Sequence, residues 1–292
     1  MSVDVSSNSP PPAASTSTSF LGRLGSRVER VRSYLCVGID PDPAALPAGF
    51  SPDVAGIEAF SRLVIEAASP YAAAFKANVA FFEAFGSDGI VALERVRAAI
   101  PSDIPFIADA KRGDVSSTVA RQAAALFDSL GADAVTANPY LGREAIEPLL
   151  DRTDRFVYVL CRTSNPGAGE FQDLVIDVDP LFVHVARRVA AWQAGGDQVG
   201  LVVGATAPSE MATIRSAAPT LPILVPGLGA QGGDLAAVLA YGPATAPPGS
   251  AAKGAGLLVN VSRGIASAAL ESADPGAALA AAARGWADRL PC

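Results

Sequence analysis

The chain has 292 residues, of which 50% are hydrophobic, and this is enough to bury the core of one α/β barrel of about 250 residues. Its net charge of −7 argues against nucleic acid or an anionic membrane as the main partner, so an anionic ligand would have to bind in a local basic pocket. No apolar run is long and uninterrupted enough to span a bilayer.

The first segment of the chain is rich in Ser, Pro and Thr, which cannot bury enough apolar surface to offset the entropy cost of ordering. We therefore predict a disordered tail at residues 1–20 and one barrel domain at residues 21–292. The tail lacks the basic start and apolar core of a signal peptide. Cys36, Cys161 and Cys292 have no metal-ligand spacing, and an odd number of cysteines fits a reduced, cytoplasmic protein without disulfides.

Eight short apolar segments follow along the chain, and each is predicted to be a strand. They begin at Tyr34, Ala73, Phe106, Ala134, Phe156, Val199, Ile223 and Gly256. Between most of them lie segments with helical periodicity, such as residues 56–69 and 89–100. This alternation predicts an α/β fold in which parallel strands are covered by helices, as a single (β/α)8 TIM barrel. An open doubly wound sheet is the alternative, and it is less favoured because no GxGxxG follows the first strand.

Polar side chains lie where the first four predicted strands end. They are Asp40, Lys76, Asp109 with Lys111, and Asn138. Asp109 and Lys111 are two residues apart, so an extended strand would present both on one face. Because buried unpaired charge is costly, this pair favours a functional site at the carboxyl end of the barrel, where such folds carry their active sites. A solvated strand end with a structural salt bridge remains the alternative.

Two glycine-containing turns follow the seventh and eighth strands, at residues 226–234 and 260–265. Glycine leaves backbone N–H groups free to approach an anion, while Gln231 and Arg263 add side-chain donors, so we expect an anion site here. A plain strand-to-helix turn is the alternative for the first turn.

The longest connection, about 40 residues, follows the fifth strand and is expected to act as a closing lid with Ser164 and Gln172 as ligand contacts. The stretch at residues 241–255 is expected to be an inert loop at the opposite end of the barrel. The only histidine, His184, lies in an ordinary helical pattern, so histidine triads and multi-histidine metal sites are disfavoured.

Six segments, in order, resemble one enzyme family. They are GIDP, FKANVAFFEAFG, DAKRGD, TSNPGAGEFQ, PGLGAQGGD and NVSRGI, within residues 34–265. They resemble the orotidine 5′-phosphate decarboxylases, in particular the bacterial type 2 subgroup with an FFExFG segment. The resemblance implies a homodimer of (β/α)8 barrels that converts orotidine monophosphate to uridine monophosphate and CO2 in pyrimidine biosynthesis, with no metal or organic cofactor.

The resemblance also implies a catalytic network of alternating charges. Its members are Lys76, Asp109, Lys111 and Asp114. Lys111 would protonate C6 of the pyrimidine, Asp109 would lie against the departing carboxylate, and Lys76 would link the ribose to the charged row. Asp114 would come from the neighbouring subunit. A carbanion at C6 is poorly delocalised, so a fixed cation that can also donate a proton suits this chemistry.

The remaining positions implied by the resemblance bind the substrate. Asp40 would contact the ribose, and Thr118 would reach the site from the neighbouring subunit. Ser164 of the lid would touch the pyrimidine amide, and Gln231 with Arg263 would hold the phosphate.

Two other functions remain open at this point. A metal-dependent aldolase or decarboxylase on the same barrel would keep the acid and the lysine on the third strand but would need a divalent metal. A catalytically silent nucleotide-binding barrel is the second alternative, because a fold does not by itself imply a function.

Overall fold

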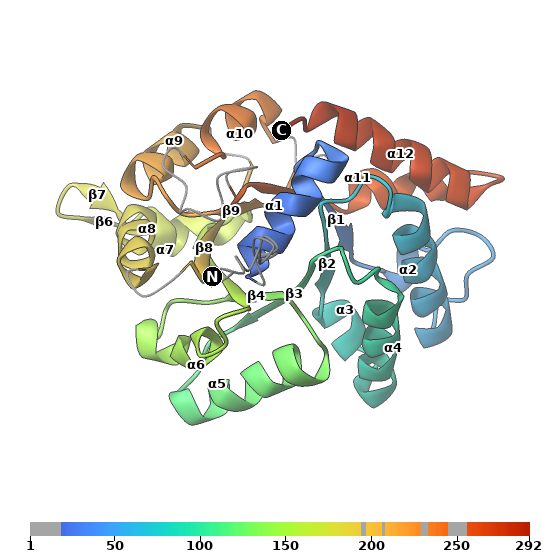
Figure 1. Ribbon diagram of the computed structural model, residues 1–292, viewed down its shortest axis with the longest axis horizontal. Coiled ribbons are helices and arrows are strands. Elements are labelled where there is room, and N and C mark those ends of the chain that lie inside the picture. Colours follow the sequence, from blue (N-terminus) through green and yellow to red (C-terminus); the bar gives the residue numbers. More distant parts are fainter. Residues whose placement is uncertain (1–18, 194–196, 206–207, 229–232, 245–255) are drawn as a thin grey trace, which may run out of the picture.

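The computed structural model describes residues 19–193, 197–205, 208–228, 233–244 and 256–292. Within these ranges, eight parallel strands form a closed barrel in the order β1–β10–β9–β8–β5–β4–β3–β2 (Figure 1). The strands are β1 (Leu35–Ile39), β2 (Ala74–Asn78), β3 (Phe106–Arg112), β4 (Ala134–Ala137), β5 (Phe156–Arg162), β8 (Val199–Val203), β9 (Ile223–Val225) and β10 (Leu258–Val261). All eight predicted strands and the single α/β barrel are confirmed.

Helices surround the barrel, because their apolar faces pack on strands that are almost entirely buried. They are α1 (Phe20–Val31), α2 (Val54–Ala68), α3 (Ala80–Glu83), α4 (Gly86–Ala99), α5 (Ser116–Ala123), α6 (Glu147–Leu150), α7 (Gly169–Gln172), α8 (Leu181–Trp192), α9 (Pro208–Ala217), α10 (Leu235–Tyr241), α11 (Arg263–Ala266) and α12 (Pro275–Arg289). Both helical segments expected before the second and third strands are present, as α2 and α4. No helix within the described ranges is long and apolar enough to cross a membrane.

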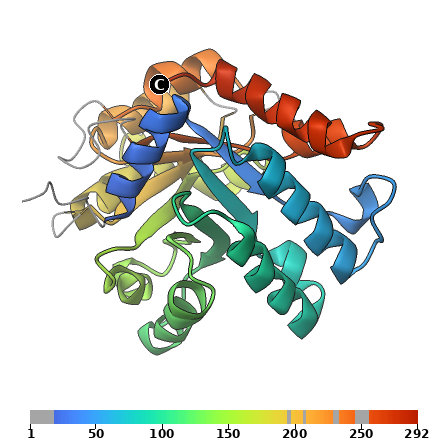
Figure 2. The same cartoon turned by 45° about the vertical axis from the view of Figure 1, so that its right-hand side comes forward.

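Helix α1 lies across one end of the barrel (Figures 1 and 2). Ser19 caps it by accepting a hydrogen bond from the backbone N–H of Gly22 at 3.2 Å. Phe20 is buried and stacks on Phe156 of β5, with ring centroids 4.9 Å apart. The prediction that the tail extends to residue 20 is therefore corrected by two residues, since the helix cap and this aromatic contact order them. The rest of the predicted tail, residues 1–18, lies outside the described ranges.

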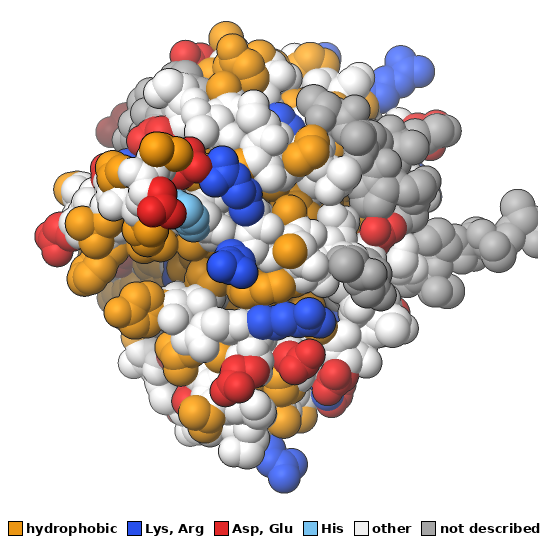
Figure 3. Space-filling view, turned by 90° about the vertical axis from the view of Figure 1, so that its left-hand side faces the viewer, with side chains coloured by type: hydrophobic (Ala, Val, Ile, Leu, Met, Phe, Trp, Pro, Cys, Tyr) orange, Lys and Arg blue, Asp and Glu red, His pale blue; other side chains and the backbone are white. Residues whose placement is uncertain are grey.

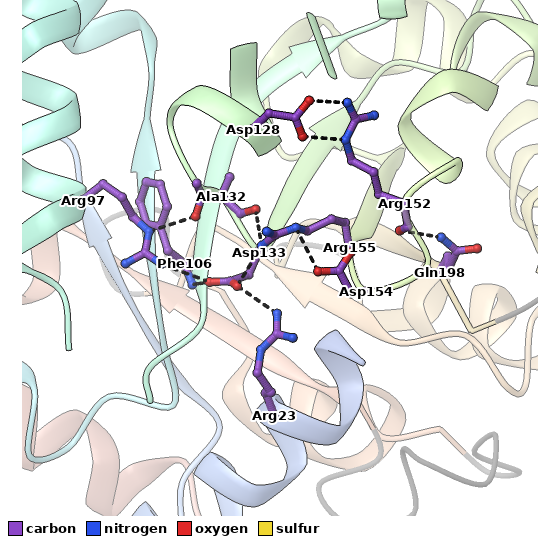
Figure 4. Close-up of polar contacts among 11 residues, drawn as sticks. Arg23, Arg97, Phe106, Asp128, Ala132, Asp133, Arg152, Asp154, Arg155 and Gln198 are labelled. Carbon is purple, nitrogen blue, oxygen red and sulfur yellow. Dashed lines mark hydrogen bonds and ion pairs between the residues drawn. The ribbon is translucent and has the colours of Figure 1, made fainter. Parts of the chain in front are cut away.

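The same end of the barrel is held by one buried carboxylate. Asp133 precedes β4, and its Oδ1 accepts hydrogen bonds from Arg23 of α1 at 2.8 Å and from Arg155 at 3.2 Å (Figure 4). Arg97 of α4 lies 3.6 Å from Oδ2, which also accepts the backbone N–H of Phe106 at 2.9 Å. One residue thus links α1, α4 and the starts of two strands. The contacts at this end stabilise the barrel. In this fold the active site lies at the opposite end, where the strands have their carboxyl ends.

The connection after β5 contains α7, a two-stranded hairpin and α8. The hairpin strands are β6 (Val175–Ile176) and β7 (Asp179–Pro180). They lie outside the barrel and extend away from it at the left of Figure 1. Most of the expected inert loop at residues 241–255 lies outside the described ranges, because these ranges stop at residue 244 and resume at residue 256.

Candidate active site

The polar side chains predicted at the strand ends gather at the carboxyl end of the barrel. Asp40 follows β1 and Lys76 belongs to β2. Asp109 comes from β3, and Arg263 is the first residue of α11. These four side chains line one cavity of about 170 Å3 together with the backbone turn that follows β9. The barrel therefore assembles a charged pocket from residues that are far apart in the sequence.

A second cavity of about 510 Å3 adjoins the first, since Lys76 and Asp109 line both. It adds Lys111 of β3, Thr136 of β4 and Ser164 of the loop after β5. The charged residues thus stand between a narrower polar pocket, which Arg263 also lines, and a wider one, which the loop after β5 lines. An elongated ligand with a charged end could occupy both cavities.

A row of alternating charges forms the centre of the site. Lys76 Nζ donates to Asp109 Oδ2 at 2.7 Å, and Lys111 Nζ donates to Asp109 Oδ1 at 2.7 Å. The side chain of Lys76 is only 4% exposed, whereas that of Lys111 is 48% exposed. One lysine is therefore fixed within the protein, and the other presents its ammonium to the open cavity.

The pKa values follow from this arrangement. Burial by itself would raise the pKa of Asp109, but the ammonium groups of Lys76 and Lys111 outweigh it and hold that pKa well below its usual range. Burial would lower the pKa of Lys76, but the carboxylates of Asp109 and Asp40 outweigh it and raise that pKa. The Lys76–Asp109 pair is therefore ionised throughout the neutral range.

The backbone of β3 is irregular between Asp109 and Lys111. Register with β4 jumps from Ala108 opposite Val135 to Arg112 opposite Ala137, and Lys111 adopts a φ of 49°. The prediction of a regular extended strand through Lys111 is therefore corrected. The side chains of Asp109 and Lys111 still meet. A bulge with a strained backbone at Lys111 directs the lysine side chain towards the Asp109 carboxylate.

Asp114 and Thr118 do not take part in this row within their own chain. The carboxylate of Asp114 accepts the backbone N–H of Val115 at 2.7 Å, and Thr118 is exposed on the first turn of α5. Neither residue lines the two cavities. Their assignment to a site shared between subunits stays a prediction.

The expected anion site is partly described. Arg263 stands beside Gly227, Leu228 and Ser262 in the narrower cavity, so the turns after β9 and β10 do meet. Gly227 has a φ of 96°, a left-handed conformation that glycine adopts without strain. Gln231 lies outside the described ranges. The assignment of these residues to a phosphate stays a prediction.

The loop after β5 covers the wider cavity from one side. Ser164 lines this cavity, and its role in a lid stays a prediction. Gln172 also lines it, but its Oε1 accepts the backbone N–H of Thr163 at 2.8 Å and its Nε2 donates to the Thr163 hydroxyl at 2.8 Å. The amide of Gln172 is therefore committed to holding the start of the loop in shape.

Six polar residues that line the two cavities were not among the predicted binding residues. They are Asn78, Thr136, Thr163, Asn165, Asn260 and Ser262. The hydroxyl of Thr136 donates to Asp109 Oδ1 at 2.9 Å and accepts the backbone N–H of Lys111 at 2.9 Å. Asn78 could have been found from the alternation of inward residues, since it lies two positions after Lys76 in β2. Asn138, two positions after Thr136, is exposed and lines neither cavity, so the same signal was absent for Thr136.

The described part of the chain offers little for catalysis by histidine, by a thiolate or by a metal ion. His184 of α8 lies 3.1 Å from the carbonyl oxygen of Ile176. Figure 3 shows the side of the molecule that carries the β6–β7 hairpin, where hydrophobic, acidic and basic side chains are mixed at the surface. Burial raises the pKa of the Cys36 thiol to about 12, so it stays neutral. Among these residues no three His, Cys, Asp or Glu side chains group so that they could hold a metal ion.

Comparison with known proteins supports the resemblance. Residues 33–282 match the model of the orotidine 5′-phosphate decarboxylase / HUMPS family. The chain is 48% identical over 222 residues to an orotidine 5′-phosphate decarboxylase of Herpetosiphon aurantiacus, covering 76% of this chain and 83% of that one.

Two solved structures of proteins from Leishmania donovani are also similar to this chain. The first is OMP decarboxylase, with a TM-score of 0.78 and 40% identity over 92% of this chain and 96% of that one. The second is UMP synthase, with a TM-score of 0.78 and 42% identity over 92% of this chain. The match spans 56% of the length of UMP synthase.

Proposed function

Because the chain belongs to the orotidine 5′-phosphate decarboxylase / HUMPS family, we propose that its row of Lys76, Asp109 and Lys111 converts orotidine 5′-phosphate to uridine 5′-phosphate and CO2. The reaction is that of a carboxy-lyase in pyrimidine synthesis. The observation that carries the assignment of the site is the row itself, in which an exposed ammonium stands next to a carboxylate that two lysines keep ionised.

Lys111 supplies the cation and the proton. When the bond between C6 and the carboxylate carbon breaks, its electron pair remains on C6 and CO2 leaves. The Lys111 ammonium stabilises that negative charge as it develops and then transfers a proton from Nζ to C6. The 48% exposed side chain and its place in the wider cavity support this role, because the ammonium can reach a bound ring.

Asp109 and Lys76 keep this ammonium in place. Asp109 Oδ1 holds Lys111 Nζ at 2.7 Å and, in our proposal, lies against the substrate carboxylate until it departs. Lys76 fixes the other carboxylate oxygen and, with Asp40, faces the narrower cavity, where we place the ribose. The Oδ1 atom of Asp40 is buried and receives no hydrogen bond in the described chain, which is consistent with a donor such as a ribose hydroxyl completing the site after a small adjustment.

The phosphate lies, in this proposal, at the end of the narrower cavity. Arg263 is exposed there and can give two parallel N–H bonds to a phosphate, with Gln231 as a second donor. Ser164 contacts the pyrimidine from the lid side. Binding the remote phosphate can close the lid, so that its binding energy is expressed in the transition state.

We further propose a homodimer in which Asp114 and Thr118 complete the site of the neighbouring subunit. Both residues stand outside the cavities of their own chain. Apolar side chains are exposed nearby on the loops that follow β3 and β4, with Val115 at 55%, Tyr140 at 80% and Leu141 at 51%. An interface over these loops would cover that apolar surface and carry Asp114 to the partner's site.

A cytoplasmic location is our proposal as well. Three free cysteines, Cys36, Cys161 and Cys292, support it, because thiols stay reduced in that compartment.

The activity is tested by the ultraviolet absorbance of orotidine 5′-phosphate mixed with purified protein in excess chelator. We expect a rapid loss of the orotate chromophore, because no step of the mechanism needs a metal. Loss of activity on chelation would instead support the metal-dependent alternative. Binding of uridine 5′-phosphate without turnover would support the catalytically silent one.

The shared site is tested by mixing two inactive variants. Lys111→Ala and Asp114→Ala are each expected to be inactive alone, because every site in each homodimer lacks one group. After subunit exchange, we expect about a quarter of wild-type activity, since half of the subunits then sit in heterodimers that hold one intact site out of two. Mixing Lys111→Ala with Asp109→Ala is the control and should restore nothing, because both residues belong to one chain's row. If the mixture of Lys111→Ala with Asp114→Ala also restores no activity after subunit exchange, Asp114 acts within its own subunit.

A further inference from the structure

The hydroxyl of Thr136, on strand β4, forms hydrogen bonds with both Asp109 and Lys111 of the neighbouring strand β3. We propose that Thr136 is a positioning residue, which holds Lys111 and Asp109 in their reactive arrangement through one buried hydroxyl. This inference rests on the proposed function of the Lys76–Asp109–Lys111 row. It adds a residue that acts through the row and does not itself exchange a proton with the substrate.

The first observation is that Thr136 joins the two residues directly. Its Oγ1 donates to Asp109 Oδ1 at 2.9 Å and accepts the backbone N–H of Lys111 at 2.9 Å. A hydroxyl has one proton to donate, and here that proton is directed at the carboxylate. Asp109 Oδ1 therefore receives two hydrogen bonds, one from this hydroxyl and one from Lys111 Nζ.

The second observation is the backbone conformation of Lys111. A φ of 49° in a residue with a side chain is strained and persists only where the surroundings enforce it. The bulge in β3 removes Lys111 from the regular ladder with β4, and the hydroxyl of Thr136 takes the N–H that the ladder would otherwise pair. The hydroxyl thus stabilises the conformation that turns the ammonium onto Asp109.

The third observation is burial. Thr136 is 1% exposed, so its hydroxyl is not available to solvent and its two hydrogen bonds to the row are kept in a low-dielectric setting. A threonine in a buried strand needs a partner for its hydroxyl, and here both partners belong to the catalytic row. A valine would fill nearly the same volume without either hydrogen bond, which makes the hydroxyl testable separately from packing.

The test compares Thr136→Val and Thr136→Ser with Ser61→Ala. Ser61 is the matched control, because it is also buried and its hydroxyl donates to the carbonyl of Ile57 in α2, away from the site. For each variant, kcat and KM with orotidine 5′-phosphate, the inhibition constant of uridine 5′-phosphate and the melting temperature are measured. We expect Thr136→Val to lower kcat between about tenfold and about 100-fold, because the ammonium is misplaced.

The split between kcat and binding distinguishes positioning from a general loss of structure. The inhibition constant of Thr136→Val should stay within about threefold of wild type, since the groups that bind the phosphate and ribose are unchanged. Thr136→Ser keeps the hydroxyl and should recover kcat to within about threefold, and Ser61→Ala should leave kcat unchanged even if it lowers the melting temperature. If the valine variant does not fold, Thr136→Ala and Thr136→Ser are compared in its place.

The proposal is overturned if a folded variant without the hydroxyl keeps kcat within about twofold of wild type. It is also overturned if the serine and valine variants lose the same activity, because the hydroxyl would then not matter. A wild-type protein that does not turn over orotidine 5′-phosphate would overturn the proposed function instead, so the two failures are distinguishable.

Discussion

Replacing Lys111 by alanine is expected to lower kcat by at least about 10⁴-fold, because one group supplies both the charge stabilisation and the proton. Binding of uridine 5′-phosphate should largely survive, since the ribose and phosphate groups are held by other residues in the narrower cavity. The measurement is single-turnover decarboxylation at saturating substrate, combined with calorimetric titration of uridine 5′-phosphate. Loss of turnover with intact binding would place Lys111 in the chemical step.

Two variants serve as controls for this result. Lys111→Arg keeps a cation but cannot give up a proton easily, so it should also be severely impaired. Arg62→Ala removes a cation from the surface of α2, where it pairs with Glu58, and should leave turnover unchanged. Turnover of Lys111→Ala within about tenfold of wild type, a difference of only about 1.4 kcal/mol, would refute the assigned role.

Replacing Asp109 by asparagine is expected to affect both activity and stability. It removes the carboxylate that holds Lys111 and leaves the ammonium of Lys76, 4% exposed, without its nearest counter-charge. Breaking a buried ion pair by removing one partner costs about 3–5 kcal/mol. We expect that loss in the free energy of unfolding at pH 7, together with a fall in kcat of about 10³-fold. Urea unfolding and steady-state kinetics measure the two effects.

The stability effect should depend on pH in a defined direction. The folded-state pKa of Asp109 is lowered, so its contribution is present above the unfolded carboxyl pKa of about 3.9 and is lost as the pH falls towards the folded value. The pKa of Lys76 is raised, so its contribution is present below about 10.4 and is lost as the pH rises through the folded value. The difference between wild type and Asp109→Asn should therefore be largest between about pH 4 and pH 10.

Urea unfolding at pH 7 and pH 3 checks this dependence. The difference in the free energy of unfolding between wild type and Asp109→Asn should shrink at pH 3. Asp128→Asn is the matched control, since Asp128 pairs with Arg152 at the surface, and its effect should be small at both values of pH. A difference for Asp109→Asn that is equal at pH 3 and pH 7 would contradict the account of the buried pair.

The sequence by itself determined the barrel, its eight strands and the charged residues at their carboxyl ends. Apolar runs alternating with helical segments are local patterns, and their physical basis is the burial of each strand between its neighbours and a covering helix. Asp40, Lys76, Asp109 and Lys111 could be placed at one end of the barrel because parallel strands all end on the same side. The position of Arg263 after the last strand followed from the same rule.

Only the tertiary structure decided which of these groups touch. The Lys76–Asp109 ion pair depends on β2 lying next to β3, and the contact of Thr136 with Asp109 depends on the stagger between β3 and β4. The bulge at Lys111 and the helix that brings Phe20 onto Phe156 were likewise not apparent from local periodicity. Such contacts join residues distant in the chain, and their geometry is set by how the closed barrel packs as a whole, which the local sequence pattern does not encode.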